Sequence, residues 1–313
     1  MVSTIAIYAV LYASLAVFVV ASIVRAAGYA RLPLHLRWEI YPVPHEEKGR
    51  AAHGGSYFEM KDWWTQPAKF NRSGELKAML AEMLFLKGLW EFKKKTWYRS
   101  YPFHLGLYLL FGATALLFSS AFLWIVAPRS WAAGPGIVLH GACVILGPAG
   151  IGLTLAGAAG LLLQRLTDAD LKPYTTPADI FNLLFFIVAA GFLAAGYLWR
   201  GKGSFSAFAL ARGLLTFDAG LRVPALFGFG LVLGALLVAY IPLTHMSHFI
   251  AKYFTYHSVR WGDQPNGRGS GIEKRIAEML TYRPTWAAPH IGADGAKTWA
   301  EIAITNPAQG GKK

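Results

Sequence analysis

Cysteine is almost absent from this chain, which has only Cys143, within an apolar run. A single cysteine excludes an internal disulfide, a Cys-x-x-Cys-His haem attachment and a four-cysteine zinc or iron–sulfur site built by this chain alone. Any iron–sulfur chemistry in which the protein takes part must therefore come from a partner protein.

Charged residues are also scarce. They make up 15% of the sequence, whereas about a quarter is usual for a soluble domain, and 55% of the residues are hydrophobic. The formal net charge of +13 is compatible with nucleic-acid binding, but the basic residues flank apolar segments and do not form one basic face. Composition thus predicts a membrane protein that has no nucleic-acid partner.

Five apolar runs are long enough to cross a bilayer, which takes about 20 residues. They are 4–27 (I), 102–127 (II), 136–163 (III), 178–199 (IV) and 224–250 (V). Run I has no charged residue before Arg25 and no Ala-x-Ala-like cleavage site, so we expect a retained helix and not a cleaved signal peptide. The predicted fold class is all-α, a polytopic membrane protein with a five-transmembrane-helix bundle and a cytoplasmic loop and tail.

The distribution of lysine and arginine predicts the orientation, because cytoplasmic loops carry the excess. Twenty-five of the 30 basic residues lie in the 25–99 loop, the 164–176 connection and the tail from 252, and the other five lie in the II–III and IV–V connections. We therefore expect the N-terminus outside and the C-terminus cytoplasmic, in the cytoplasmic (inner) membrane of a bacterium or archaeon. The expected parts are helix I (1–27), a cytoplasmic loop (28–99), the core of helices II–V (100–250) and a cytoplasmic tail (251–313).

Two shorter segments have amphipathic patterns. Segment 75–95 places its leucines, methionines and Trp90 near one face and ends in Lys93, Lys94 and Lys95, as expected of a helix on the inner membrane interface. Segment 205–217 predicts a similar helix on the outer side.

Four of the nine histidines lie in or at the ends of the apolar runs: His104, His140, His245 and His248. His104 opens run II, and His245 and His248 close run V, so all three are expected near the cytoplasmic face. Two imidazoles on facing helices are the ligand set of a b-type haem, although interfacial histidines also simply bond carbonyls or headgroups. His140 opens run III at the outer side, roughly 25–30 Å away in depth at 1.5 Å per residue, and is too far to share that haem.

Three motifs surround these histidines in a regular order. They are Pro102-Phe103-His104-Leu105-Gly106, then Leu162-Leu163-Gln164-Arg165-Leu166 with Tyr174-Thr175-Thr176-Pro177-Ala178-Asp179-Ile180, and finally Ile241-Pro242-Leu243-Thr244-His245-Met246-Ser247-His248. Over residues 100–255 this pattern resembles the gamma subunit of respiratory nitrate reductase and its relatives, the membrane cytochromes b of sulfite-reduction and heterodisulfide-reductase-like complexes.

The resemblance implies two haems b in the family, and their ligand positions carry over unevenly. His104 and His248 fall on the pair that holds the cytoplasmic-side haem, whereas the outer pair falls on Thr114 and Gly230, which do not bind iron. One haem b is therefore expected. His245 replaces a basic position, so it is expected to serve a haem propionate or to be a substitute ligand.

The implied substrate is a membrane quinone, either menaquinone or ubiquinone. An outer quinone site near His140 is one expectation, since an imidazole can bond a quinone carbonyl or accept a quinol proton. A site closer to His104 and His245 is the alternative.

The loop and tail are longer than in the nitrate reductase subunit. Segments 32–39, 62–64 and 284–290 look more like the relatives that associate with a soluble iron–sulfur subunit of the heterodisulfide-reductase type. The expected partners are that cytoplasmic subunit and membrane lipid. A periplasmic c-type cytochrome is a further candidate partner. The tail is polar, and we expect it to gain order by lying along the partner.

The sequence thus predicts a haem b-containing subunit that exchanges electrons between quinone and a cytoplasmic iron–sulfur protein. A haem-free membrane anchor for a soluble redox enzyme is the alternative. A transporter is disfavoured, because the apolar cores lack acidic residues and the chain shows no inverted repeat.

Overall fold

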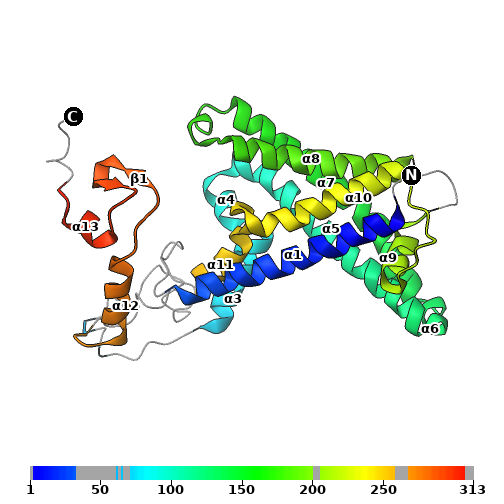
Figure 1. Ribbon diagram of the computed structural model, residues 1–313, viewed down its shortest axis with the longest axis horizontal. Helices are drawn as coiled ribbons and strands as arrows, with labels where there is room; N and C mark the ends of the chain where they lie inside the picture. The colour runs from blue at the N-terminus through cyan, green and yellow to red at the C-terminus, as the bar shows by residue number, and fades with distance from the viewer. Residues whose placement is uncertain are drawn as a thin grey trace. The chain divides into compact units, whose positions relative to one another are not determined.

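The computed structural model describes residues 3–32, 61–62, 65, 71–199, 205–257 and 267–306. In this part of the chain five helices are long and apolar enough to cross a membrane, as the sequence predicted. They are α1 (Thr4–Arg31), α5 (Lys94–Val126), α7 (Pro135–Thr167), α8 (Pro177–Leu198) and α10 (Ala225–Tyr240). Figure 1 shows them as the long ribbons of the bundle.

Short elements connect and follow these helices. They are α3 (Arg72–Phe85), α4 (Lys87–Phe92), α6 (Pro128–Ala132), η3 (Lys172–Tyr174), α9 (Ala207–Thr216), η4 (Ile241–Leu243), η5 (His245–Ser247), α11 (His248–His257), α12 (Gly271–Leu280), β1 (Ala287–Ala288), η7 (Pro289–Ile291), β2 (Ala293–Asp294) and α13 (Trp299–Ile304). Trp38, Trp63 and Trp64, which the sequence assigned to the cytoplasmic loop, lie outside the described residues.

Local sequence explains where the spanning helices begin. Pro135 and Pro177 occupy the first turns of α7 and α8, where a missing N–H costs nothing. Thr176 caps α8 by accepting from the backbone N–H of Asp179, and the Asp179 carboxylate accepts from the N–H of Thr176 in return. Ser206 caps α9 in the same manner, through the N–H of Ala209.

Two predicted helices are interrupted. The expected run 224–250 ends as α10 at Tyr240 and continues as two short turns before α11. Pro242 explains the break, since it has no N–H and its ring hinders a continuous helix. Thr244 then takes an extended conformation, so His245 lies in a turn and not in a helix. Segment 75–95 is divided at Leu86, which has a left-handed φ of 52°.

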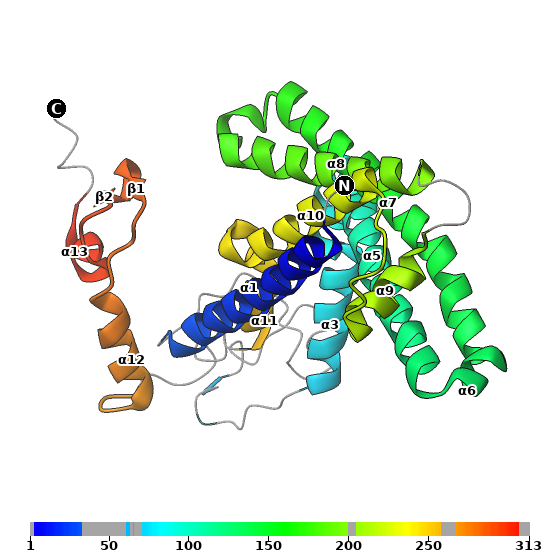
Figure 2. The same ribbon diagram turned by 45° about the vertical axis from the view of Figure 1, so that its right-hand side comes forward.

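The chain divides into two compact units, which are residues 1–23 with 80–247 and residues 24–79 with 248–313. In the first unit, α5 packs along α7, α7 along α8 and α8 along α10, while α9 lies against α5 (Figures 1 and 2). No comparably close packing joins α5 directly to α10 among these described helices.

Small residues permit the closest of these contacts. A Cβ on Gly157 of α7 would lie 2.4 Å from the backbone nitrogen of Phe103 on α5. Phe103 is buried beside Ala158, Leu183 and Phe186 in a hydrophobic cluster shared by α5, α7, α8 and α10. Between apolar helices that lie in lipid, such van der Waals packing replaces the hydrophobic drive that operates in water.

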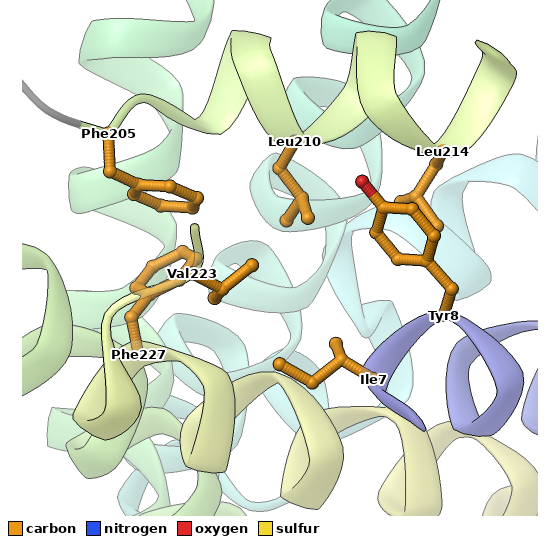
Figure 3. Packing of buried hydrophobic residues seen from close by; sticks show 7 residues of the cluster. All are labelled: Ile7, Tyr8, Phe205, Leu210, Leu214, Val223 and Phe227. Atoms are coloured by element: carbon orange, nitrogen blue, oxygen red, sulfur yellow. The ribbon is translucent and has the colours of Figure 1, made fainter. Parts of the chain in front are cut away.

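A second hydrophobic cluster holds one end of this unit together. Its buried members, shown in Figure 3, are Ile7, Tyr8, Phe205, Leu210, Leu214, Val223 and Phe227. The Tyr8 hydroxyl donates to the carbonyl of Asp218 at 3.2 Å, and the Tyr12 hydroxyl donates to the carbonyl of Leu214. The start of α1 and the α9 region therefore share one end of the unit, which we call the α9 end.

The opposite end, which we call the Asp179 end, contains the start of α5, the end of α7 and the start of α8. Gln164 donates from Nε2 to the Thr96 hydroxyl at 3.0 Å, and Lys95 lies 3.0 Å from the Asp168 carboxylate. That pairing, chiefly the hydrogen bond from Lys95, lowers the pKa of Asp168. The Lys95–Asp168 pair therefore stabilises the folded protein at pH values above the pKa that Asp168 has in the unfolded chain. This stabilisation is lost as the pH falls through the lower pKa that Asp168 has in the folded protein.

Large apolar side chains cover the outside of the spanning helices. Phe111 is 79% exposed, and Val138 and Ile145 are each 71% exposed. Such a surface is unsuited to water, whereas hydrocarbon covers it at no cost.

The tail in the second unit has its own small fold. β1 pairs antiparallel with β2, and α13 begins at a capping box between Thr298 and Glu301. Trp286 and Trp299 pack edge to face with ring centroids 5.6 Å apart. This differs from the expectation that the tail is too polar to order itself, because the hairpin and the caps satisfy its backbone groups locally.

We expect Gly157→Ala to lower the free energy of unfolding by about 1–3 kcal/mol, because the added methyl group forces α7 away from the backbone of α5. Thermal unfolding of the purified protein in detergent, followed by tryptophan fluorescence, measures this effect. Gly152→Ala is the matched control, since a Cβ there would meet no described atom within 4 Å. Equal unfolding temperatures for the two variants would contradict the proposed packing.

Candidate functional site

His104 lies in the first turns of α5 with a defined ring orientation. Its Nδ1 lies 2.7 Å from the carbonyl oxygen of Ser100, one turn earlier, and 3.3 Å from the Ser100 hydroxyl. Because a carbonyl can only accept, Nδ1 carries the proton and the lone pair of the neutral imidazole is on Nε2. This is the tautomer in which histidine binds a metal while a backbone carbonyl fixes the ring.

Aromatic rings surround His104. The Phe103 ring lies edge-on at a centroid distance of 5.3 Å, and the Tyr108 ring lies at 6.4 Å. The Tyr108 hydroxyl in turn donates to the carbonyl of Met83 on α3. His104 is thus half-buried among rings, at the edge of the Phe103 cluster.

His245 belongs to a polar group at the same Asp179 end. Its Nε2 lies 3.6 Å from Oδ1 of Asp179 and 3.4 Å from Nδ2 of Asn182. Oδ2 of Asp179 lies 3.5 Å from a guanidinium nitrogen of Arg165. We call these four residues, Arg165, Asp179, Asn182 and His245, the Asp179 cluster.

The cluster is assembled from three separate parts of the chain. Arg165 is in the last turn of α7, Asp179 and Asn182 are in the first turns of α8, and His245 follows the break at Pro242. The α7–α8 connection brings Arg165 and Asp179 together, since α8 must start beside the end of α7. The capping role of Asp179 then holds its carboxylate at the helix terminus, where the helix dipole also favours negative charge.

The nitrogen of His245 that would bind iron is engaged. Coordination through Nε2 would require His245 to leave both Asp179 and Asn182. The expectation that His245 serves a haem propionate or substitutes as a haem ligand stays a prediction.

His140 lies far from both of these groups. Its ring packs edge-on against Phe208 of α9 at a centroid distance of 5.2 Å, and its Nδ1 is buried with no partner among the described residues. Gly157, which faces Phe103, lies 17 residues further along α7. At 1.5 Å per residue the two levels are roughly 25 Å apart along α7.

The two positions that the resemblance assigns to an outer haem face different surroundings. Thr114 is exposed, and its hydroxyl donates to the carbonyl of Leu110 at 2.8 Å. Gly230 lies against α8, where a Cβ would meet the backbone nitrogen of Leu193 at 2.7 Å. Neither residue has a side chain that binds haem iron, and the backbone of α8 fills the space beside Gly230.

His248 is the first residue of α11, in the second unit. The sequence pairs it with His104, and that pairing remains a prediction.

No protein-family model, curated protein or solved structure matches this chain. Function must therefore be argued from the residues themselves.

Sequence reasoning named His245 but missed its partners Arg165, Asp179 and Asn182. A usable signal was present in Thr176-Pro177-Ala178-Asp179, which predicts a capping box at the start of a spanning helix. That capping box places the Asp179 carboxylate beside His245.

Substitution of Asn182 tests whether the Asp179 cluster contributes to the stability of the folded protein. The residue is 5% exposed, and its Oδ1 is buried without a partner among the described residues. A buried amide with an unbonded oxygen contributes little net stability, so Asn182→Leu should change the free energy of unfolding by less than about 1 kcal/mol. Thermal unfolding in detergent measures this.

Asn182→Ala is the comparison variant and should be less stable than Asn182→Leu, because it leaves a void. If Asn182→Leu is instead the less stable of the two, the amide is a structural element.

Proposed function

We propose that this protein is a membrane-embedded b-type cytochrome subunit, which exchanges electrons between a membrane quinone and a cytoplasmic iron–sulfur partner. The observation that carries the proposal is the hydrogen bond between His104 Nδ1 and the Ser100 carbonyl, which leaves the iron-binding lone pair on Nε2. The residue motifs from 100 to 255 supply the likeness to the membrane cytochromes b of nitrate reductase and heterodisulfide-reductase-like complexes.

The proposed topology places the Asp179 end in the cytoplasm and the N-terminus outside. Lys95, Arg99, Arg165 and Lys172 lie at the Asp179 end, in keeping with the excess of basic residues on cytoplasmic loops. The contacts of Tyr8 and Tyr12 with the α9 region support it further, since they put two segments assigned to the outside at the same end of the unit.

Haem b fits the chemistry of His104, and His104 with His248 would hold it. When bound, haem b supplies a reversible one-electron iron couple. The Ser100 carbonyl orients the His104 ring and raises the basicity of Nε2, while the Phe103 ring packs edge-on against the imidazole.

A single haem is proposed. The exposed Thr114 and the tight contact of Gly230 with α8 support this number, because an outer haem needs two ligands facing a common space.

The tail is proposed to bind the iron–sulfur subunit. Although Trp286 and Trp299 pack on each other, the small fold still exposes apolar side chains: Leu280 is 38%, Trp286 45% and Ile304 86% exposed. Exposed aromatic and aliphatic groups on a small polar domain are typical of interface anchors.

His104→Ala and His248→Ala should each abolish the low-spin bis-imidazole spectrum of the purified protein, because each removes one of the two histidines that would hold the haem. Low-temperature electron paramagnetic resonance of the oxidised protein measures it. His245→Ala is the control and should keep the spectrum, since Nε2 of His245 is held by Asp179 and Asn182. An unchanged spectrum in His248→Ala together with its loss in His245→Ala would show that the ligand assignment is wrong.

Truncation after Arg268 removes α12, the hairpin and α13 as one piece. Membrane insertion and the haem spectrum should stay intact, while the soluble partner is lost during affinity purification of the complex. Stoichiometric co-purification of the partner with the truncated protein would exclude the tail as the docking element.

A further inference from the structure

We propose that the Asp179 cluster is a quinone-headgroup site, in which Nδ1 of His245 hydrogen-bonds the headgroup. This inference rests on the proposed function, and it places the quinone at the Asp179 end and not beside His140.

The first support is the contrast in burial within the cluster. The His245 side chain is 62% exposed, whereas Asp179 behind it is 14% and Asn182 5% exposed. Since Nε2 faces the buried carboxylate, the outward-facing nitrogen is Nδ1, which has no partner among the described residues.

The second support is that both contacts of the His245 ring are made by Nε2. The Asp179 carboxylate can only accept a hydrogen bond and the Asn182 amide nitrogen can only donate one, so the two contacts favour opposite tautomers of the neutral ring. In either tautomer Nδ1 hydrogen-bonds the headgroup, by accepting from a quinol hydroxyl or by donating to a quinone carbonyl. Asp179 is itself held by Thr176 and Arg165, so the imidazole is oriented before a ligand arrives.

The charge of the cluster selects a neutral ligand. The Asp179 carboxylate is matched by the Arg165 guanidinium at 3.5 Å, so the pair carries no net charge toward an incoming headgroup. An anionic phospholipid headgroup would gain little from such a pair, whereas a neutral quinol needs only the hydrogen bond.

Aromatic side chains next to the cluster suit the ring and tail of a lipid-soluble ligand. The rings of Phe181 and Phe185 on α8 lie 5.8 and 6.0 Å from the ring of Tyr240 on α10. Phe181, which precedes Asn182, is 53% exposed, and Leu243, two residues before His245, is 56% exposed. Exposed apolar side chains thus lie within a few residues of the cluster along the chain, at the start of α8 and after the end of α10.

The third support is distance. His140 lies roughly 25 Å in depth from the level of Phe103 and His104. With a single haem at His104, a quinone beside His140 would be far from that haem. His245 is closer, because its neighbour Met246 packs against the hydrophobic cluster that contains Phe103, the neighbour of His104.

The test is a binding titration of the full-length protein in detergent with the fluorescent quinol analogue heptyl hydroxyquinoline N-oxide, whose emission is quenched when it binds. We expect His245→Ala to weaken binding by about tenfold, the effect of losing one hydrogen bond to the headgroup. Asp179→Asn should weaken it less, because it keeps an oxygen for the α8 cap but removes the negative charge beside the imidazole. Asp168→Asn, which removes a carboxylate at the same end but outside the cluster, is the matched control.

The outcomes separate this inference from the proposed function. If the unmodified protein carries haem and binds the analogue, but His245→Ala and Asp179→Asn bind it as tightly as Asp168→Asn does, the inference is wrong and the cytochrome assignment stands. Loss of binding in His140→Ala alone would move the site to the α9 end. If the unmodified protein neither carries haem nor binds the analogue, the proposed function fails as well. A His245→Ala protein that does not fold would leave the decision to Asp179→Asn.

Discussion

If the five long apolar helices cross a membrane, as we propose, polar groups among them have no water to bond, and this constraint governs the rest of the account. Some of them bond within their own helix, as the hydroxyls of Thr114 and Thr167 do with carbonyls one turn earlier, and others bond to a neighbouring element, as Gln164 does with Thr96. At the Asp179 end, Lys95 pairs with Asp168 and Arg165 pairs with Asp179. Within α5, Nδ1 of His104 bonds the carbonyl of Ser100, and that bond orients the imidazole ring.

Buried polar atoms that have no hydrogen-bond partner are informative for the same reason. Nδ1 of His140 and Oδ1 of Asn182 are buried with no partner among the described residues. Packing alone gives no reason to retain an imidazole or an amide in such places, since an apolar residue of similar size avoids the desolvation cost. Asn182 contacts His245 and so belongs to a polar group that reaches an exposed imidazole. His140 sits under Phe208 of α9, and its retention has no comparable explanation in the contacts around it.

Much of the helical layout followed from the sequence, because an apolar run of spanning length has few alternatives to a helix. The expected run 178–199 became α8 at 177–198, and 205–217 became α9 at 207–216. The break after Tyr240 was missed because hydropathy continues across Pro242, whereas backbone geometry does not. The Asp179 cluster was missed for a different reason. It joins Arg165, Asp179 and His245 from three parts of the chain, and hydropathy and motif order carry no information on which side chains meet. The small fold of the tail depends on turns and caps, which are weak signals beside the long apolar runs.

The central claim is that the bundle holds one haem b through His104. The most direct measurement is the haem content of the purified full-length chain, with the pyridine haemochrome assay set against protein concentration and a dithionite-reduced absorption spectrum. The account predicts b-type bands and a haem-to-protein ratio near one. A ratio near two would contradict the single-haem assignment, and a chain purified from haem-replete cells without haem would support a haem-free membrane anchor instead.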